Sequence, residues 1–310
     1  MLSIDGRLRD SLIRKKNEFD ALKHKHSAAA QSVHAGLKAE FIYNSNAIGQ
    51  RFLTLSETAR VISEGAAIKG RSLDDHLAVR VHENALGFIE MCAHKKRGVI
   101  SERTLCEIHA IIMRDTAGAG AYRTAAAQPY GPWHRPPSAG QVAGDMKNLF
   151  AWYRDKHKYL TTVECAALFH HKLLNIHPFT SGNGKAARLF LNLQLVREGY
   201  PLIVILRNDA KKYCSALKAA DRGTFGPLVK FMTQAVVRSL DMYLKNAGGP
   251  SKANERFITL AKLSKRVPYS AKYLNLLVRE GKLEAHKDGR NWLSSVEAMR
   301  RYLDTRQRKR

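Results

Sequence analysis

Residues 177–188 read His-Pro-Phe-Thr-Ser-Gly-Asn-Gly-Lys-Ala-Ala-Arg. His177 offers a proton acceptor just ahead of a Gly-Asn-Gly turn, and Lys185 and Arg188 place two cations just after it. Leucine and valine mix with polar residues over 189–198, and a glycine and a proline follow. This pattern predicts a helix that begins at the turn and ends before that glycine.

The turn of Gly182, Asn183 and Gly184 therefore lies at a predicted helix N-terminus. Unpaired backbone N–H groups point outward there, and the helix dipole favours an anion by about 0.3–1 kcal/mol. Glycine lets a ligand approach the backbone closely because it has no side chain. The stretch predicts a phosphate site with a base beside it.

This stretch resembles the Fic family signature, His-x-Phe-x-(Asp/Glu)-Gly-Asn-Gly-Arg-x-x-Arg, at ten of its twelve positions. Other segments follow the family's order and spacing: Ser45 to Ile48, Leu53 to Thr58, Tyr122 to Thr124 and Asn192 to Leu195. The resemblance covers residues 40–245 of the chain. It implies a mainly α-helical Fic core with a small β-hairpin flap.

The resemblance also implies a role for each motif residue. The expected general base is His177, the expected phosphate-binding residues are Gly182, Asn183, Gly184 and Lys185, and Arg188 is expected to meet the outermost phosphate. Most members transfer AMP from ATP to a Ser, Thr or Tyr hydroxyl of another protein. Imidazole suits a base because it titrates near neutral pH. The alternative for His177 is a histidine whose cation complements the C-terminal dipole of the preceding helix.

Two departures from the signature weaken the enzyme interpretation. Ser181 stands where the family places the Asp or Glu that holds Mg²⁺, and a neutral hydroxyl is a poor ligand for this ion. The metal would then rely on phosphates and water, or on a distant carboxylate such as Asp209 or Asp221. Lys185 replaces an Arg and loses its planar fork, so nucleotide binding is expected to survive better than transfer. Kinase-type relatives carry Lys at the position of Gly184 and lack the final Arg, so a kinase-type inverted nucleotide is disfavoured.

A third departure concerns the family's self-inhibitory helix, which usually reads Ser-x-x-x-Glu-Gly-Asn and pairs its Glu with the final motif Arg. Here Ser45 is followed by Gly49, Gln50 and Arg51, so the inhibitory carboxylate is missing. Arg188 is therefore expected to have no resident anion that competes with a γ-phosphate.

The flap is expected at Tyr122, Arg123 and Thr124, which precede three alanines and the turn-rich stretch 129–137. In the family this segment is a short hairpin whose edge pairs with the backbone of the target, and such pairing reads little sequence. Alanine is a poor strand former, so the alternative is an ordered loop that only covers the pocket.

The chain of 310 residues carries a formal net charge of +25 and has a pI near 10.1. This predicts an acidic or polyanionic partner, nucleic acid first, while an evenly basic, solubilising surface is the alternative. The four cysteines are far apart and form no Cys-x-x-Cys pair, and no segment approaches 18 apolar residues. We therefore expect a cytoplasmic protein without a membrane span.

The sequence predicts five segments. A basic helical extension occupies 1–40, the Fic domain 41–246 and a linker 247–254. Residues 255–305 read as helix, turn, helix, hairpin and helix, which resembles a winged helix-turn-helix of the MerR or excisionase type. Residues 306–310 form a basic tail.

The C-terminal segment is a candidate DNA-binding module. From residue 251 onward, sixteen Lys and Arg stand against six Asp and Glu, a density that suits DNA phosphates. In such modules the second helix enters the major groove and the wing follows the backbone. The expected contacts are Lys272, Asn275, Arg279, Lys287 and Arg290. The alternative is an appendage that binds protein or only packs.

Two function classes remain open at this point. One is an AMP transferase with ATP as substrate and an unidentified protein target; Mg²⁺ is only weakly supported. The other is a DNA-associated regulator whose Fic pocket senses a nucleotide. Transfer of a group other than AMP is a third interpretation, and a homodimer remains open. The intact His177 and Arg188 favour the transferase, whereas Ser181 and Lys185 favour the sensor.

Gly49→Glu is expected to lower the affinity for ATP, because the new carboxylate would pair with Arg188 and compete with a γ-phosphate. Calorimetric titration of the purified full chain with ATP checks this. Unchanged affinity would contradict the hypothesis of an uninhibited site.

Overall fold

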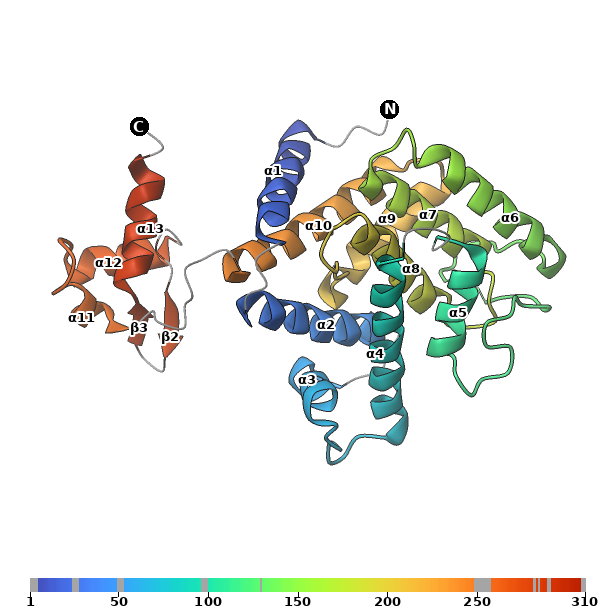
Figure 1. The fold of residues 1–310 in the computed structure, drawn as a ribbon, viewed down its shortest axis with the longest axis horizontal. Coiled ribbons are helices and arrows are strands. Elements are labelled where there is room, and N and C mark those ends of the chain that lie inside the picture. Colours follow the sequence, from blue (N-terminus) through green and yellow to red (C-terminus); the bar gives the residue numbers. More distant parts are fainter. Residues whose placement is uncertain are drawn as a thin grey trace. The chain divides into compact units, whose positions relative to one another are not determined.

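The computed structural model describes residues 5–23, 28–48, 53–95, 100–128, 130–247, 258–280, 283, 285–288 and 291–307. Two compact units divide the chain, Met1–Gly248 and Gly249–Arg310. The first unit contains the helices α1 (Gly6–Lys23), α2 (Ala28–Ile48), α3 (Leu55–Glu64), α4 (Leu73–Ala93), α5 (Glu102–Ile112), α6 (Ala139–Lys156), α7 (Thr162–Ile176), α8 (Asn183–Arg197), α9 (Ala210–Asp221) and α10 (Gly226–Ala247), with a short 3-10 turn at Arg207–Asp209 (Figure 1). The prediction of a mainly α-helical chain is confirmed.

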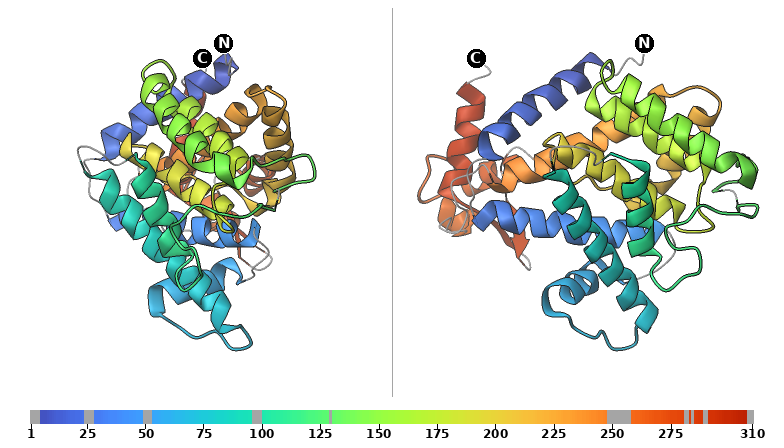
Figure 2. Two further views of the ribbon diagram at one scale, coloured as in Figure 1. Left: turned by 90° about the vertical axis from the view of Figure 1, so that its right-hand side faces the viewer. Right: turned by 45° about the vertical axis from the view of Figure 1, so that its right-hand side comes forward.

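Helix α8, which follows the Gly-Asn-Gly turn, lies at the centre of the first unit (Figure 2). It packs against α4, α5 and α7, and its residues 186–195 are all buried. Buried polar side chains generally need hydrogen-bond partners, and several inside this stretch have them. Asn192, for example, donates to the carbonyls of Arg188 and Ile203 and accepts from the Ile203 N–H. The start of α8, where the Gly-Asn-Gly turn lies, is thus supported by a well-packed core.

Local sequence signals set several helix starts. Thr54 caps α3, and Thr161 caps α7. In each case the hydroxyl accepts from the N–H three residues later, and the Glu at that position accepts from the N–H of the cap. These are capping boxes, which satisfy two otherwise unpaired donors. Their Ser/Thr-x-x-Glu pattern is visible in the sequence.

An aromatic cluster joins the helices on either side of the motif. Phe169 on α7 is fully buried, with its ring centroid 5.0 Å from that of Phe190 on α8 and 5.3 Å from that of Phe150 on α6. Aromatic pairs at these separations add attraction beyond the area that they bury. The cluster fixes α7 against α8 and therefore fixes the loop between them.

The prediction of a β-hairpin flap is wrong for the described residues. Residues 121–128 and 130–138 contain no strand and run as an ordered loop. Two features of the sequence explain this: the alanine run 125–127 is a poor strand former, and the prolines of 132–137 cannot donate to a ladder. The loop alternative describes this segment correctly.

The second unit contains β1 (Ile258–Thr259), α11 (Leu260–Leu263), α12 (Ala271–Arg279), β2 (His286–Asp288), β3 (Asn291–Ser294) and α13 (Val296–Gln307). The three strands form one antiparallel sheet in the order β1-β3-β2. Leucines of α11 and α12 form its core with residues before β2 and on α13: Leu260, Leu263, Leu274, Leu277, Leu283 and Met299. The predicted helices and hairpin are present, whereas β1 was not predicted.

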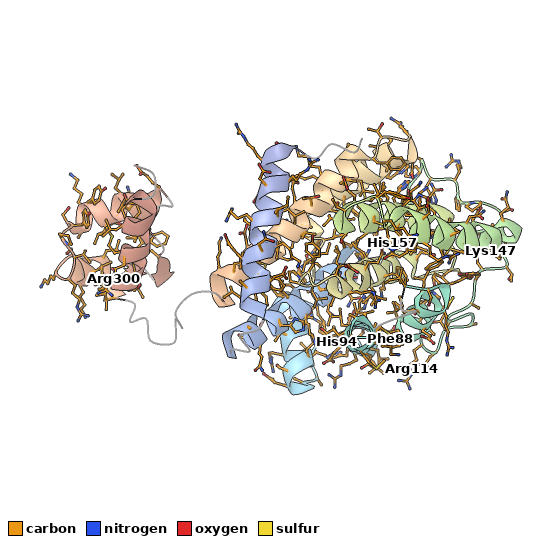
Figure 3. All side chains as sticks on the ribbon, turned by 45° about the horizontal axis from the view of Figure 1, so that its top comes forward. Phe88, His94, Arg114, Lys147, His157 and Arg300 are labelled. Carbon is orange, nitrogen blue, oxygen red and sulfur yellow. The ribbon has the colours of Figure 1, made fainter. Side chains whose placement is uncertain are left out.

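Basic side chains account for much of the exposed surface. Lys147 and Arg114 lie at the periphery of the first unit, and Arg300 lies on the second (Figure 3). Among the described helices, none is both long and apolar enough to span a membrane.

Phe169→Ala is expected to lower the free energy of unfolding of the first unit by about 3–5 kcal/mol, because it removes buried aromatic contacts and leaves a cavity. Urea denaturation followed by circular dichroism checks this. Tyr159→Ala is the matched control, since Tyr159 is 76% exposed, and its effect should stay within about 0.5 kcal/mol. Equal losses in both variants would contradict the central role of the cluster.

Candidate active site

His177 ends helix α7 in a left-handed backbone conformation, with φ 52° and ψ 59°. Such a conformation is uncommon for a residue other than glycine and often marks a functional position. The backbone N–H of His177 donates to Leu173, and its carbonyl accepts from Arg123 Nε at 2.8 Å. These bonds hold the residue where the chain turns from α7 toward the Gly-Asn-Gly turn.

The surroundings of the His177 ring suit a base. Its Nδ1 lies 3.3 Å from the carbonyl oxygen of Leu174, which can only accept, so Nδ1 carries the proton and Nε2 keeps its lone pair. Burial lowers the pKa of His177 to about 4, so the ring is neutral at physiological pH. A neutral ring carries no positive charge that could complement the helix dipole, so these surroundings favour the base interpretation of His177 over the electrostatic alternative.

Two side chains of the loop lie beside the His177 ring. The ring centroid of His134 is 5.5 Å from it, and that of Tyr130 is 6.1 Å away. His134 bonds the Asn175 carbonyl through Nε2 at 2.8 Å, which ties the loop to α7. Neither residue was predicted to belong to the site, because the sequence of 129–137 indicates only a turn-rich segment.

The Gly-Asn-Gly turn forms the start of α8, as the sequence predicts. Gly182 is its N-cap, with φ 73°, and a Cβ there would lie 2.7 Å from Met113 Sδ. Asn183 is buried, and its side-chain amide pairs with both the N–H and the carbonyl of Phe179. Its side chain therefore shapes the loop. The backbone N–H groups in the first turn of a helix have no partner within the helix and are suited to meet an anion.

His109 on α5 is a further residue that the sequence analysis missed. Its Nδ1 accepts from the Gly120 N–H at 2.9 Å, so its Nε2 must carry the proton that it donates to the Ser181 carbonyl at 3.0 Å. The ring also stacks on Phe179 with a centroid distance of 3.7 Å. Burial lowers its pKa, which keeps it neutral. A histidine within an amphipathic helix gives no signal of this role.

Arg188 lies inside the protein, only 5% exposed, one turn into α8. Its Nε donates to Ser45 Oγ and its Nη2 to the Ser45 carbonyl, both at 3.0 Å. Its Nη1 would lie 3.2 Å from a Cβ at Gly184. The structure therefore brings Arg188 together with the turn and with α2. Lys185 is half-buried nearby and contributes to the low pKa of His82.

The three predicted flap residues have different environments. Arg123 is buried and donates to the carbonyls of His177, Ala125 and Pro137. Tyr122 donates to Glu102 at 2.8 Å, and Thr124 is exposed. The Arg123 guanidinium therefore holds the loop on the motif, and Thr124 is the one of the three that faces solvent.

The residues around the turn do not fit a Mg²⁺ ion held by protein carboxylates. Ser181 is exposed and offers a neutral hydroxyl. Asp209 is paired with Arg238 at 3.2 Å, and Asp221 accepts from Tyr130, His171 and Asn175. Over the described part of the chain, no group of three or more His, Cys, Asp or Glu side chains could hold a metal ion.

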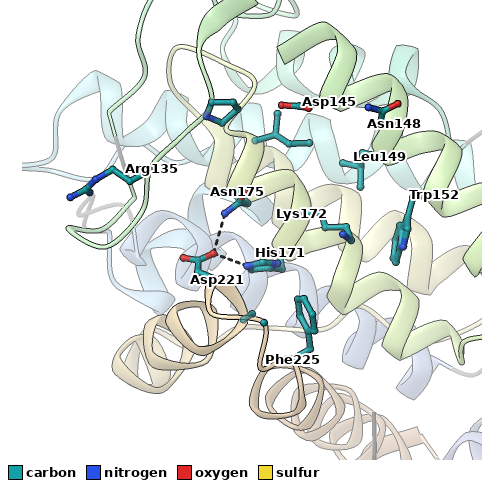
Figure 4. Close-up of a pocket in the computed structure, with 14 residues that line it drawn as sticks. Arg135, Asp145, Asn148, Leu149, Trp152, His171, Lys172, Asn175, Asp221 and Phe225 are labelled. Carbon is teal, nitrogen blue, oxygen red and sulfur yellow. Dashed lines mark hydrogen bonds and ion pairs between the residues drawn. The ribbon is translucent and has the colours of Figure 1, made fainter. Parts of the chain in front are cut away.

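A pocket of about 620 Å³ adjoins the Asp221 cluster (Figure 4). Asn175 and His171 point toward the carboxylate of Asp221, while Arg135 points away from it. The walls of the pocket come from α6, α7 and the end of α9. Gly182, Arg188 and His177 do not line the pocket. His171 Nε2 bonds the Asp221 carboxylate at 2.7 Å within this cluster.

The predicted DNA contacts belong to the second unit. Lys272 and Arg279 are exposed on α12. Asn275, on the same helix, is half-buried. Gly49, Gln50, Arg51, Arg290 and the side chain of Lys287 lie outside the described residues.

A model of the Fic/DOC family matches residues 99–195. The chain is similar to protein adenylyltransferase Fic of Drosophila erecta, with 32% identity over 245 residues that cover 78% of this chain and 49% of that protein. It is similar to the same-named protein of Culex quinquefasciatus, with 32% identity, 74% of this chain and 48% of that protein. The chain thus spans about half the length of the curated relatives it matches.

Among solved structures, the chain is similar to a Fic domain containing signaling protein from Bacteroides thetaiotaomicron. The identity is 28% and the TM-score 0.73, and the match covers 78% of this chain and 99% of that one. The fold of a Fic family protein from Desulfovibrio desulfuricans is also similar, with 20% identity, a TM-score of 0.66 and coverage of 95% and 97%. The motif, its position at the start of α8 and these matches agree, and the chain therefore contains a domain of the Fic/DOC family.

Proposed function

We propose that the Fic domain transfers AMP from ATP to a hydroxyl of another protein. The observation that carries this proposal is a neutral His177, with Nε2 as a proton acceptor, ahead of a helix N-terminus that is backed by the buried Arg188. The similarity to proteins named protein adenylyltransferase Fic supports the choice of transferred group.

The proposed reaction uses the chain's own groups. His177 Nε2 takes the proton of the target hydroxyl as its oxygen attacks the α-phosphorus of ATP. The new oxygen–phosphorus bond replaces the bond to the bridging oxygen, and pyrophosphate leaves with its electron pair. The backbone N–H groups of Gly182 to Gly184 stabilise the phosphate charge, and a well-placed base contributes about 100-fold to 10,000-fold in rate.

The departures at Ser181 and Lys185 bear on the rate of this proposed transfer. Among the described residues, no group of carboxylates around the turn could hold a metal ion, so charge stabilisation would fall to backbone N–H groups and cationic side chains. Lysine carries a charge but lacks the two-pronged donor of arginine. We infer that the chain is a slow transferase with an uninhibited site.

His177→Ala is expected to abolish transfer, because it removes the proton acceptor. Purified protein is incubated with ATP and Mg²⁺ or Mn²⁺, with and without lysate, and intact mass is measured. Wild type should add the mass of AMP to itself or to a lysate protein. His157→Ala is the matched control, since His157 also ends a helix but is exposed.

The two histidine variants separate catalysis from helix capping. Full transfer by His177→Ala would contradict the base role. Equal losses in both variants would instead attribute the effect to the end of the helix. If wild type transfers no AMP but still binds nucleotide, the result would favour the alternative in which the Fic pocket only senses a nucleotide.

We propose as a second candidate that the C-terminal unit is a winged helix-turn-helix that binds DNA. The observation that favours this candidate is the exposure of Lys272 and Arg279 on α12, the second helix of the unit, within a segment of net charge +10. Cations on an exposed helix suit contacts with phosphates. With a pocket that binds nucleotide but transfers slowly, the chain would then act as a DNA-associated regulator.

Double-stranded DNA is expected to bind the full chain with an affinity that falls steeply as salt rises. Replacing both Lys272 and Arg279 by Ala should reduce the slope of log affinity against log salt by about 2, because each phosphate contact contributes about 0.9. Fluorescence anisotropy at several salt concentrations measures the slope. Lys147→Ala, on α6 of the first unit, is the control. A flat profile for wild type would exclude phosphate contacts.

A further inference from the structure

Two buried chains of hydrogen bonds converge on Arg188. The first begins at the Ala78 carbonyl, which lies 3.0 Å from His82 Nδ1. A carbonyl only accepts, so His82 Nδ1 carries the proton and Nε2 is an acceptor. Ser45 Oγ lies 3.3 Å from that Nε2 and therefore donates its hydroxyl proton to it. The Ser45 oxygen keeps its lone pairs for Arg188 Nε, which donates at 3.0 Å.

The second chain has the same order of a backbone carbonyl, a histidine and a hydroxyl. His170 Nδ1 lies 3.0 Å from the Ala187 carbonyl and must donate to it. His170 Nε2 is then the acceptor for the Tyr213 hydroxyl, at 2.6 Å. The Tyr213 oxygen in turn lies close enough to Arg188 to interact electrostatically with its guanidinium. In both chains a backbone carbonyl sets the tautomer of a histidine, and the histidine sets the direction of a hydroxyl.

All four side chains are buried and neutral. Ser45, His82, His170 and Tyr213 are each at most 4% exposed. Burial lowers the pKa of both histidines to about 3, so neither is charged at physiological pH. No ion pair within the described ranges joins Arg188 to a carboxylate. The chains therefore orient the guanidinium and leave its positive charge uncompensated.

We propose that Ser45, His82, Tyr213 and His170 are positioning residues that aim an uncompensated Arg188 at the outermost phosphate of a nucleoside triphosphate. This inference rests on the proposed nucleotide-binding function. Arg188 Nη1 already lies beside Gly184 in the turn, so an anion held by the turn meets a fixed, dry guanidinium. Electrostatic attraction is much stronger in such surroundings than in water. The site should therefore discriminate by the number of phosphates.

The test compares affinities for ATP and AMP in the full chain by isothermal titration calorimetry. Wild type is expected to bind ATP more tightly than AMP. Ser45→Ala and Tyr213→Phe should each reduce the ATP-to-AMP affinity ratio about tenfold. Ser45→Ala removes a hydrogen bond to the Arg188 guanidinium, and Tyr213→Phe removes the hydroxyl that interacts electrostatically with it. Affinity for AMP should change little, since AMP lacks the outermost phosphate. Ser45→Thr, which keeps a hydroxyl, should restore most of the ratio.

Two matched controls repeat the same chemical changes on the surface. Ser63→Ala removes a hydroxyl from exposed Ser63 on α3, and Tyr159→Phe removes one from exposed Tyr159. Neither should alter the ratio. Thermal melting of every variant establishes that it is folded, and Tyr213→Phe keeps the ring that packs in the core. The double variant of Ser45→Ala and Tyr213→Phe tests whether both act through Arg188.

The outcomes separate this inference from the function on which it rests. A ratio unchanged in folded Ser45→Ala and Tyr213→Phe would overturn the positioning role and leave the proposed transferase intact. Equal losses for ATP and AMP would also overturn it, because a general loosening of the site would explain them. A wild type that binds neither nucleotide would overturn both the proposed function and the inference.

Discussion

A buried positive charge is the constraint around which the first unit is organised. Arg188 lies in the core, where an unsolvated guanidinium is costly unless its N–H groups are satisfied. Helix α2 supplies the hydroxyl and the carbonyl that accept from Arg188, and α9 places the Tyr213 hydroxyl near it. Helices α4 and α7 supply the histidines that bond these two hydroxyls. Four helices from distant parts of the chain must therefore assemble before the cation is accommodated. The same assembly fixes the start of α8, where the Gly-Asn-Gly turn lies.

The loop between α7 and α8 depends on comparable backbone constraints. Arg123 and His109 bond carbonyls on either side of the motif, at His177 and Ser181. Asn183 closes the loop from inside through Phe179. These side chains touch the loop at points where its own backbone groups have no helical partner. The geometry of this loop is held by polar contacts at its edges and by the aromatic cluster that joins α7 and α8.

The sequence could predict what depends on neighbours along the chain. The start of α8 at the Gly-Asn-Gly turn and the capping boxes at Thr54 and Thr161 are local patterns, and the structure confirms them. His82, His109 and Tyr213 could not be found in this way, because their partners lie 37 to 72 residues away or on another helix. The flap hairpin was wrongly expected because the resemblance to the Fic family predicted two strands there. The alanine run has a poor propensity to form a strand, and the segment is a loop.

The left-handed backbone of His177 restricts how this position can drift in evolution. Most amino acids with a Cβ are strained there, and asparagine, aspartate and glycine adopt this conformation most readily. Most other replacements would disturb the end of α7 as well as remove the base. A related protein that loses the reaction but keeps the fold is therefore expected to carry asparagine, aspartate or glycine at this position. Natural substitutions at this one position would distinguish domains that only bind a nucleotide from domains that have stopped folding in this way.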